Sequence, residues 1–91
     1  MKQALFALGQ IVATAGAIDL MKAQGIDPFG LLYRHATGDW GDLDDEDKEE
    51  NDLSVQKGFR ILSAYGRERN RLWIITEADR SVTTILLPVD Y

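Results

Sequence analysis

The feature that most constrains the fold is a pair of apolar segments near the end of the chain, separated by a very short polar connection. Residues 72–77 (Leu-Trp-Ile-Ile-Thr-Glu) and residues 81–87 (Ser-Val-Thr-Thr-Ile-Leu-Leu) are rich in β-branched and aromatic side chains, which favour strands. Only Ala78 to Arg80 lie between them, which is too short for anything but a hairpin turn. We therefore predict an antiparallel hairpin that ends at Pro88.

The rest of the chain carries signals for two more strands and three helices. The expected strands are a short one within residues 4–13 and another at residues 59–65. Helices are expected at residues 15–23, from Pro28 to the residue before Gly38, and from the residue after Asp44 to about Gln56. Each follows a side chain that can cap a helix N-terminus, namely Thr14, Asp27 and Asp44.

These elements predict a single α+β domain over residues 1–91. Its expected architecture is an antiparallel β-meander of three to four strands with about three helices packed on one face. Apolar residues make up 45% of the chain, which favours a packed core over disorder. With no cysteine, the chain has neither a disulfide framework nor a thiolate zinc site.

The net charge of −5 is distributed unevenly along the chain. Residues 39–52 contain nine acidic residues and one lysine, whereas the remainder has six acidic and nine basic residues. An acidic protein repels nucleic acid unless its positive charges gather on one face, so we expect no direct DNA binding. No apolar stretch reaches the roughly 18 residues that a membrane span needs, so no membrane insertion is expected.

Several motifs together resemble those of a family of small bacterial proteins. They are His35, residues 38–43 (Gly-Asp-Trp-Gly-Asp-Leu), Asn51, residues 58–65 (Gly-Phe-Arg-Ile-Leu-Ser-Ala-Tyr) and residues 73–88 (Trp-Ile-Ile-Thr-Glu-Ala-Asp-Arg-Ser-Val-Thr-Thr-Ile-Leu-Leu-Pro). Members of this family occur on plasmids, phages and other mobile elements, and some are named plasmid-related proteins. Residues 8–14 also look like the start of the family, although Ala15 stands where proline is expected. The resemblance covers nearly the whole chain. It implies a bacterial, cytoplasmic protein and brings no established activity.

His35 lies close in sequence to two carboxylates, Asp39 and Asp42. One interpretation is a metal site, or a general base whose imidazole is oriented by a carboxylate. The other is structural: His35 bonds a loop carbonyl at the end of a helix, where the helix dipole favours the cationic ring, while the two aspartates cap backbone N–H groups of the glycine-containing turn. The pattern favours the structural interpretation, and the sequence calls for no cofactor.

The acidic run of residues 39–52 permits two interpretations beyond a calcium loop. The calcium loop fails because, counted from Asp42, its sixth position should be glycine and is Asp47, and its twelfth should be glutamate and is Leu53. The run is then either a solvated helix face with capping acids, or a mimic of a phosphate backbone that docks on a basic partner. The binding residues of the docking interpretation are Asp39, Trp40, Asp42, Asp44, Asp45, Glu49 and Glu50, with Trp40 expected to be partly exposed.

Glu77 and Arg80 flank the tip of the predicted hairpin. In the structural interpretation they pair across the turn, and Asp79 bonds the turn backbone. In the functional interpretation they join His35 as an acid–base pair with a phosphate-binding arginine, as in small microbial ribonucleases.

These observations lead to three functional hypotheses. The preferred one is a non-enzymatic interaction protein of a mobile element that inhibits a host nucleic-acid-binding defence complex, of the anti-restriction or anti-CRISPR type, through its acidic face. The second is a small toxin-like ribonuclease or metal-dependent hydrolase that uses His35, Glu77 and Arg80. The third is a homodimeric accessory protein without catalysis.

Overall fold

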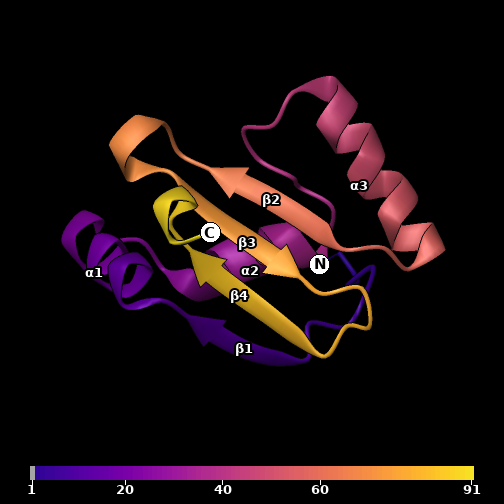
Figure 1. Cartoon of the computed structure of the whole chain (residues 1–91), viewed down its shortest axis with the longest axis horizontal. Helices are drawn as coiled ribbons and strands as arrows, with labels where there is room; N and C mark the ends of the chain where they lie inside the picture. Colours follow the sequence, from indigo (N-terminus) through magenta and orange to yellow (C-terminus); the bar gives the residue numbers. More distant parts are fainter. Residues whose placement is uncertain (1) are drawn as a thin grey trace.

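A computed structural model describes residues 2–91 as one α+β domain built around a mixed four-stranded sheet (Figure 1). In chain order the elements are β1 (Gln10–Ala13), α1 (Ala15–Gln24), α2 (Pro28–Ala36), α3 (Asp45–Lys57), β2 (Ile61–Tyr65), the 3₁₀ helix η1 (Glu68–Asn70), β3 (Leu72–Thr76), β4 (Val82–Leu86) and the 3₁₀ helix η2 (Pro88–Asp90). The predicted fold class is confirmed. The first strand is shorter than residues 4–13 because Gly9, at φ 64°, turns the chain immediately before it.

The strand order in the sheet is β1-β4-β3-β2. The last three strands form the expected antiparallel meander, in which Ser63 lies opposite Ile74 and Ile74 opposite Ile85. β1 differs, because it pairs in parallel with β4, and Ala13 lies opposite Ile85. Parallel strands cannot be joined by a tight turn, so this pairing has no local signal in the sequence.

The helix boundaries follow the predicted capping residues closely. The side chains of Thr14, Asp27 and Asp44 accept hydrogen bonds from the backbone N–H groups of Ala17, Phe29 and Asp47, respectively. α1 and α3 end at glycines in the left-handed conformation, Gly25 and Gly58. These short-range interactions satisfy backbone groups that a helix end otherwise leaves unpaired.

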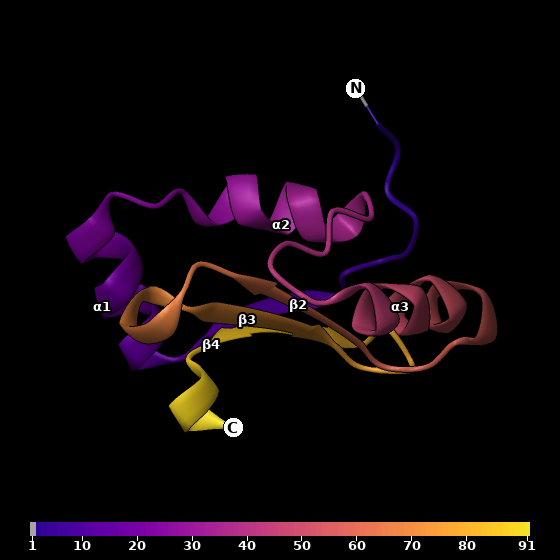
Figure 2. The same cartoon turned by 90° about the horizontal axis from the view of Figure 1, so that it is seen from above.

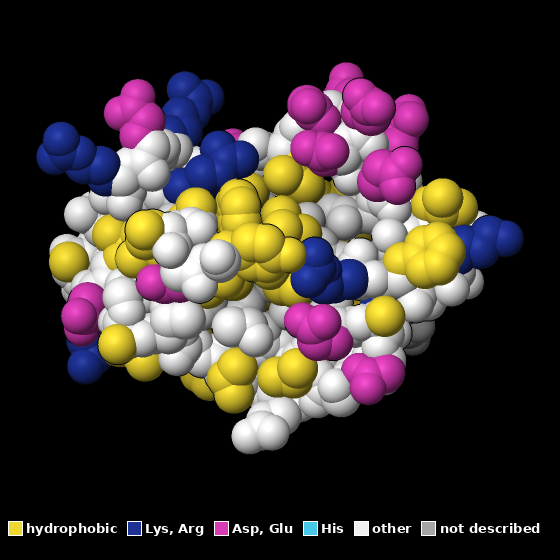
Figure 3. Space-filling view, in the orientation of Figure 1, with side chains coloured by type: hydrophobic (Ala, Val, Ile, Leu, Met, Phe, Trp, Pro, Cys, Tyr) yellow, Lys and Arg dark blue, Asp and Glu magenta, His cyan; other side chains and the backbone are white. Residues whose placement is uncertain are grey.

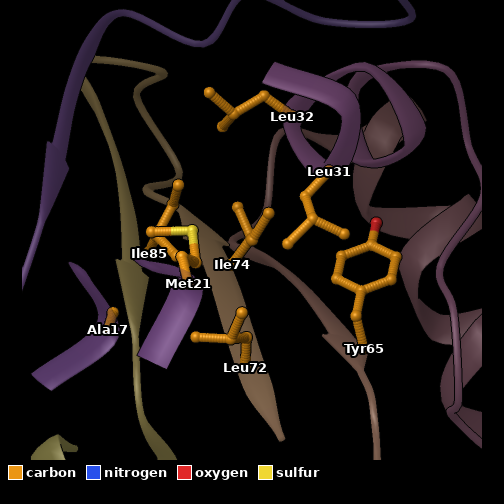
Figure 4. Packing of buried hydrophobic residues seen from close by; sticks show 8 residues of the cluster. All are labelled: Ala17, Met21, Leu31, Leu32, Tyr65, Leu72, Ile74 and Ile85. Atoms are coloured by element: carbon orange, nitrogen blue, oxygen red, sulfur yellow. The ribbon is translucent and has the colours of Figure 1, made fainter. Parts of the chain in front are cut away.

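The hydrophobic core lies between α2 and one face of the sheet, with α1 closing one end (Figure 2). Leu31 of α2 points toward Ile74 and Tyr65 (Figure 4). The core cluster consists of Ala17, Met21, Leu31, Leu32, Tyr65, Leu72, Ile74 and Ile85. On β2 and β3, inward residues alternate with residues such as Leu62 and Trp73 that face the other side of the sheet, where η2 lies (Figure 2).

α3 runs beside β2 at the edge of the sheet instead of crossing its face (Figures 1 and 2). The Asn51 side chain makes this contact: its Nδ2 donates to the Leu62 carbonyl at 2.6 Å, and its Oδ1 accepts from the Leu62 N–H at 3.2 Å. α3 has few apolar anchors, but it can still pack against the edge of β2. The buried Asn51 amide makes the two backbone hydrogen bonds at Leu62 that a neighbouring strand would otherwise make.

Membrane insertion has no candidate element in the described chain. None of the helices within residues 2–91 combines the length and apolar character that crossing a bilayer requires. α3, for example, has 13 residues, and its first turn carries three carboxylates.

Candidate functional site

The glycine-containing loop before α3 is fastened to the edge of β2. The Trp40 carbonyl accepts from the Ala64 N–H at 3.2 Å, and the Asp42 N–H donates to the Ala64 carbonyl at 2.7 Å. Gly41 has φ 76°, and a Cβ at this position would collide with the Ala64 carbonyl oxygen. Glycine is therefore required here, because the loop backbone lies directly against the strand.

Four exposed acidic residues of the 39–52 segment have hydrogen-bond partners within the protein. Asp39 pairs with Arg34 (Nε to Oδ2, 2.6 Å), and this hydrogen bond lowers the pKa of the Asp39 carboxyl. The others are Asp42, which accepts from the Gly66 N–H at 2.8 Å, Asp44, which caps α3, and Asp52, which accepts from Trp40 Nε1 at 2.9 Å. These carboxylates hold the loop and the start of α3 in place. Asp39 also accepts from the Gly41 N–H of the turn at 3.2 Å, as expected, whereas Asp42 bonds Gly66 after β2 and not the turn itself.

The remaining acidic residues of the segment project from α3. They are Asp45, Glu46, Asp47, Glu49 and Glu50, which are all exposed. Within residues 2–91 their side chains have no hydrogen-bond or ion-pair partner closer than 4 Å. Figure 3 shows acidic side chains gathered over α3, apart from the basic side chains near η1. The charge segregation of the sequence thus becomes a surface of unneutralised carboxylates.

A groove separates this acidic surface from the exposed face of the sheet. It has a volume of about 360 Å³. Its lining residues, which define the acidic groove, are Leu43, Asp47, Glu50, Asn51, Leu62, Arg71 and Trp73. Leu62 and Trp73 form an apolar floor, and two α3 carboxylates form one wall. The Arg71 guanidinium on the other side is occupied in part by the Asp42 carbonyl, at 3.2 Å.

The chemistry of the acidic groove suits a cation on a long aliphatic stem. A lysine or arginine side chain can lay its methylenes on an indole and place its charge against carboxylates. Asp47 and Trp73 are central to this arrangement, although sequence reasoning selected neither. The signal for Trp73 was its alternation with the inward residues Leu72 and Ile74, which places it on the other face of β3.

Trp40 corrects an expectation drawn from the sequence. It was expected to be partly exposed, but only 4% of its surface is accessible. Its indole packs edge-on against His35 and stacks with Phe6, with ring centroids 6.0 and 6.3 Å apart. Burial is affordable here because Nε1, the one polar atom of the side chain, donates to Asp52. Trp40 is therefore a core residue and not a docking residue.

His35 is completely buried under Phe6 and Trp40 and lies at the centre of a chain of hydroxyl groups. Nδ1 bonds the Ser63 hydroxyl, and Nε2 lies 2.9 Å from Thr76 Oγ1. Thr76 Oγ1 is in turn 2.7 Å from Thr83 Oγ1, which donates to the Leu8 carbonyl at 2.7 Å. The network joins α2 to three strands and to the N-terminal segment.

The direction of these hydrogen bonds assigns the histidine tautomer. The Thr83 hydroxyl proton is used by the Leu8 carbonyl, so Thr76 must donate to Thr83. Thr76 can then only accept from His35, which places the ring proton on Nε2 and leaves Nδ1 to accept from Ser63. Burial, with a smaller contribution from the positive charge of Arg80, lowers the pKa of His35 to about 4. The ring is neutral at physiological pH, and both nitrogens are occupied.

Arg80 also has internal partners. Its Nη1 donates to the carbonyls of Phe59 (2.7 Å) and Glu77 (3.1 Å), and its Nη2 donates to the Ser54 carbonyl at 3.0 Å. The guanidinium therefore ties the end of α3 to the β3–β4 hairpin, and it bonds the Glu77 backbone instead of the Glu77 carboxylate. The expected turn bond of Asp79 is present, because Oδ1 accepts from the Ser81 N–H at 3.0 Å.

The structure does not bring the other predicted site residues together as a chemical unit. Asp39 and Asp42 bond Arg34 and loop backbone. The expected bond of His35 to a loop carbonyl, with a cationic ring, is wrong, because the buried neutral ring bonds hydroxyls of the sheet. No group of three or more histidine or acidic side chains among residues 2–91 is arranged to hold a metal ion. Comparisons with protein-family models, curated proteins and solved structures gave no match.

Proposed function

We propose that this chain is a non-catalytic interaction protein that binds a basic surface of a partner protein through α3 and the acidic groove. The observation that carries the proposal is that only some acidic residues of the 39–52 segment have partners within the protein. All nine are exposed, but Asp39, Asp42, Asp44 and Asp52 have hydrogen-bond partners within the protein, whereas the carboxylates of Asp45, Glu46, Asp47, Glu49 and Glu50 have none among residues 2–91. Like charges crowded on one helix destabilise it, so a partner that neutralises them gains this repulsion energy on binding.

The groove beside α3 adds an apolar component to this charge. Exposed carboxylates alone steer a basic partner but contribute little affinity in salt, because water and ions screen them. Leu62 and Trp73 supply the apolar surface next to Asp47 and Glu50 on which an anchoring side chain gains affinity. The combination of charge and an apolar floor favours a specific protein contact over a charged surface that only faces solvent.

A finer proposal concerns the class of partner. The five free carboxylates fall within six helical residues, which at about 1.5 Å rise per residue is one per roughly 1.8 Å of helix axis. Duplex DNA carries about one charge per 1.7 Å of its axis. Lys48 offsets one of the five charges, which leaves one net charge per roughly 2.3 Å, about three quarters of the density of the phosphate backbone. We therefore propose that the partner surface is one that binds nucleic acid, in a host defence complex inhibited by a mobile-element protein.

A charge-reversal experiment tests the docking surface. Asp47→Lys together with Glu50→Lys places two cations on the wall of the acidic groove. Asp19→Lys together with Glu68→Lys makes the same change in net charge at exposed sites elsewhere. Tagged wild-type protein and the control pair are expected to retain the same proteins from a bacterial lysate at low salt, while the groove pair loses them. Equal retention by the groove pair would remove α3 from the interface.

Duplex DNA tests the finer proposal in the same assay. If α3 occupies a nucleic-acid-binding surface, excess duplex DNA releases the retained protein from the wild-type chain. A captured protein that stays bound in excess DNA, yet is lost in the groove pair, would contradict the phosphate-mimic proposal while leaving the docking surface in place.

A further inference from the structure

The two edges of the sheet are treated in opposite ways. The β2 edge is covered along its length: Asn51 bonds both backbone groups of Leu62, the loop bonds those of Ala64, and the Asp42 carboxylate accepts from Gly66. An uncovered strand edge is a template for pairing with another chain, and proteins that must remain monomeric protect it. The described chain protects this edge with three separate devices.

The β1 edge, by contrast, lies at the outer end of the strand order with no strand of residues 2–91 beyond it (Figure 1). The N–H groups of Gln10 and Thr14 donate to carbonyls of Ser81 and Ile85, toward β4. Backbone groups alternate in direction along a strand, so those of Ile11 point away from the sheet, and so do those of Ala13. Neither proline nor a charged side chain blocks this edge, since residues 3–18 contain none.

An apolar groove of about 380 Å³ lies beside this open edge. Residues of β1, α1 and α2 line it, including Ile11, Ala13, Ile18, Met21, Phe29 and Leu32. Several of them are strongly exposed for apolar side chains: 74% of Phe29 and 46% of Ile11 are accessible. A strand added to β1 would complete the backbone hydrogen bonds and place alternate side chains over the groove.

The charge distribution selects a second copy of this chain as the occupant. The protein is acidic, and five of its exposed carboxylates lie on α3, beside β2 at the opposite edge of the sheet, whereas α1 beside β1 carries one acidic and one basic residue, Asp19 and Lys22. β1 itself has no charged residue, and the two charges of α1 have opposite signs, so two copies that meet at this edge avoid net like-charge repulsion and hold their acidic surfaces far apart.

We propose that two copies of the chain pair through β1 in antiparallel orientation about a twofold axis at Val12. The register follows from the limits of the strand: Gly9 turns the chain before it, and Thr14 begins α1 after it. One register alone uses the outward backbone groups of Ile11 and Ala13 in both copies, by pairing Ile11 with Ala13 of the second copy. It makes four hydrogen bonds, creates a continuous eight-stranded sheet and brings the two apolar grooves together across the axis.

A cysteine at the axis tests this register directly. In the proposed pairing the two Val12 residues form a non-hydrogen-bonded pair, with Cα atoms about 4.5 Å apart, which lies within the roughly 4.4–6.8 Å range of disulfides. The chain contains no cysteine, so Val12→Cys introduces a single thiol. Under mild oxidation it is expected to form a disulfide-linked dimer on the order of tenfold faster than Ile18→Cys, which places an exposed thiol on the same groove away from the axis.

Sedimentation equilibrium of the unmodified chain supplies the second measurement. The expected mass is twice the 10.2 kDa of one chain, and Ile11→Lys, which places a charge on the open edge, is expected to return it to 10.2 kDa. A monomeric unmodified chain, a dimer insensitive to Ile11→Lys, or equal cross-linking of the two cysteine variants would each overturn the proposal. The charge reversals on α3 leave this edge unchanged, so the two proposals succeed or fail separately.

Discussion

Lowering the pH from 7 to 5 is expected to destabilise the folded protein through His35. The ring has an ordinary pKa of 6.5 in the unfolded chain and a pKa of about 4 in the folded protein. Below pH 6.5 the ring therefore binds a proton in the unfolded chain but stays neutral in the folded protein. This proton binding shifts the folding equilibrium toward the unfolded chain. The stability associated with the neutral ring is fully present above pH 6.5 and is lost as the pH falls toward 4.

The magnitude follows from the two pKa values. One pKa unit corresponds to about 1.4 kcal/mol, so the complete loss, reached below pH 4, is on the order of 3 kcal/mol. Between pH 7 and pH 5 the linkage relation gives a loss of about 2 kcal/mol in the free energy of unfolding. His35 is the one histidine of the chain, so a variant without this residue isolates its contribution to the pH dependence.

Urea denaturation followed by circular dichroism at a series of pH values measures this loss. The His35→Gln variant, which cannot titrate in this range, serves as the control and is expected to show no slope between pH 7 and pH 5. The ring carbon and proton shifts of His35 in NMR spectra give an independent reading, since the folded protein should keep a neutral Nε2–H ring at pH 5. A ring that titrates near pH 6.5 in the folded protein, or a wild-type stability that stays flat, would refute the reasoning.

Two further predictions concern side chains that join distant elements. Arg80→Met is expected to lower the free energy of unfolding by about 2–3 kcal/mol, because three carbonyls lose a charged donor, whereas the exposed Arg69→Met should change it little. Urea denaturation measures both, and equal effects would contradict the role of Arg80. Asn51→Leu is expected to cost about 1–3 kcal/mol and to promote aggregation, because it uncovers the β2 edge at Leu62. Light scattering after mild heating should separate it from the exposed control Gln56→Leu, and similar aggregation of the two would count against edge protection.

The candidate site was predictable in part. Asp45, Glu49 and Glu50 were selected from the charge pattern, and the structure leaves them exposed on α3. Trp40 and Asp44 were selected with them, yet one is buried and the other caps the helix. A run of carboxylates shows how much charge a segment carries. Which of these carboxylates have a hydrogen-bond partner within the protein depends on side chains and backbone N–H groups that the fold brings next to them.

The partners of His35 show a signal that sequence reasoning overlooked. Ser63 follows Ile61 at the strand period of two, and Thr76 likewise follows Ile74, so both fall on the buried face. Polar residues in phase with buried ones call for a polar partner, and the chain has one histidine to supply it. The phase alone, however, does not pair particular strands with a particular helix.

The sequence by itself determined the features that arise from contacts between near neighbours. These are the three capped helices, the β3–β4 hairpin and the concentration of acidic residues before and within α3, because capping bonds, turn lengths and periodicity act over a few residues. The tertiary structure alone decided that β1 lies parallel to β4, that the His35 ring is neutral and enclosed, and that one sheet edge is covered while the other is open. Each of these results depends on backbone and side-chain groups far apart in the chain competing for the same partners, and only the folded arrangement settles that competition.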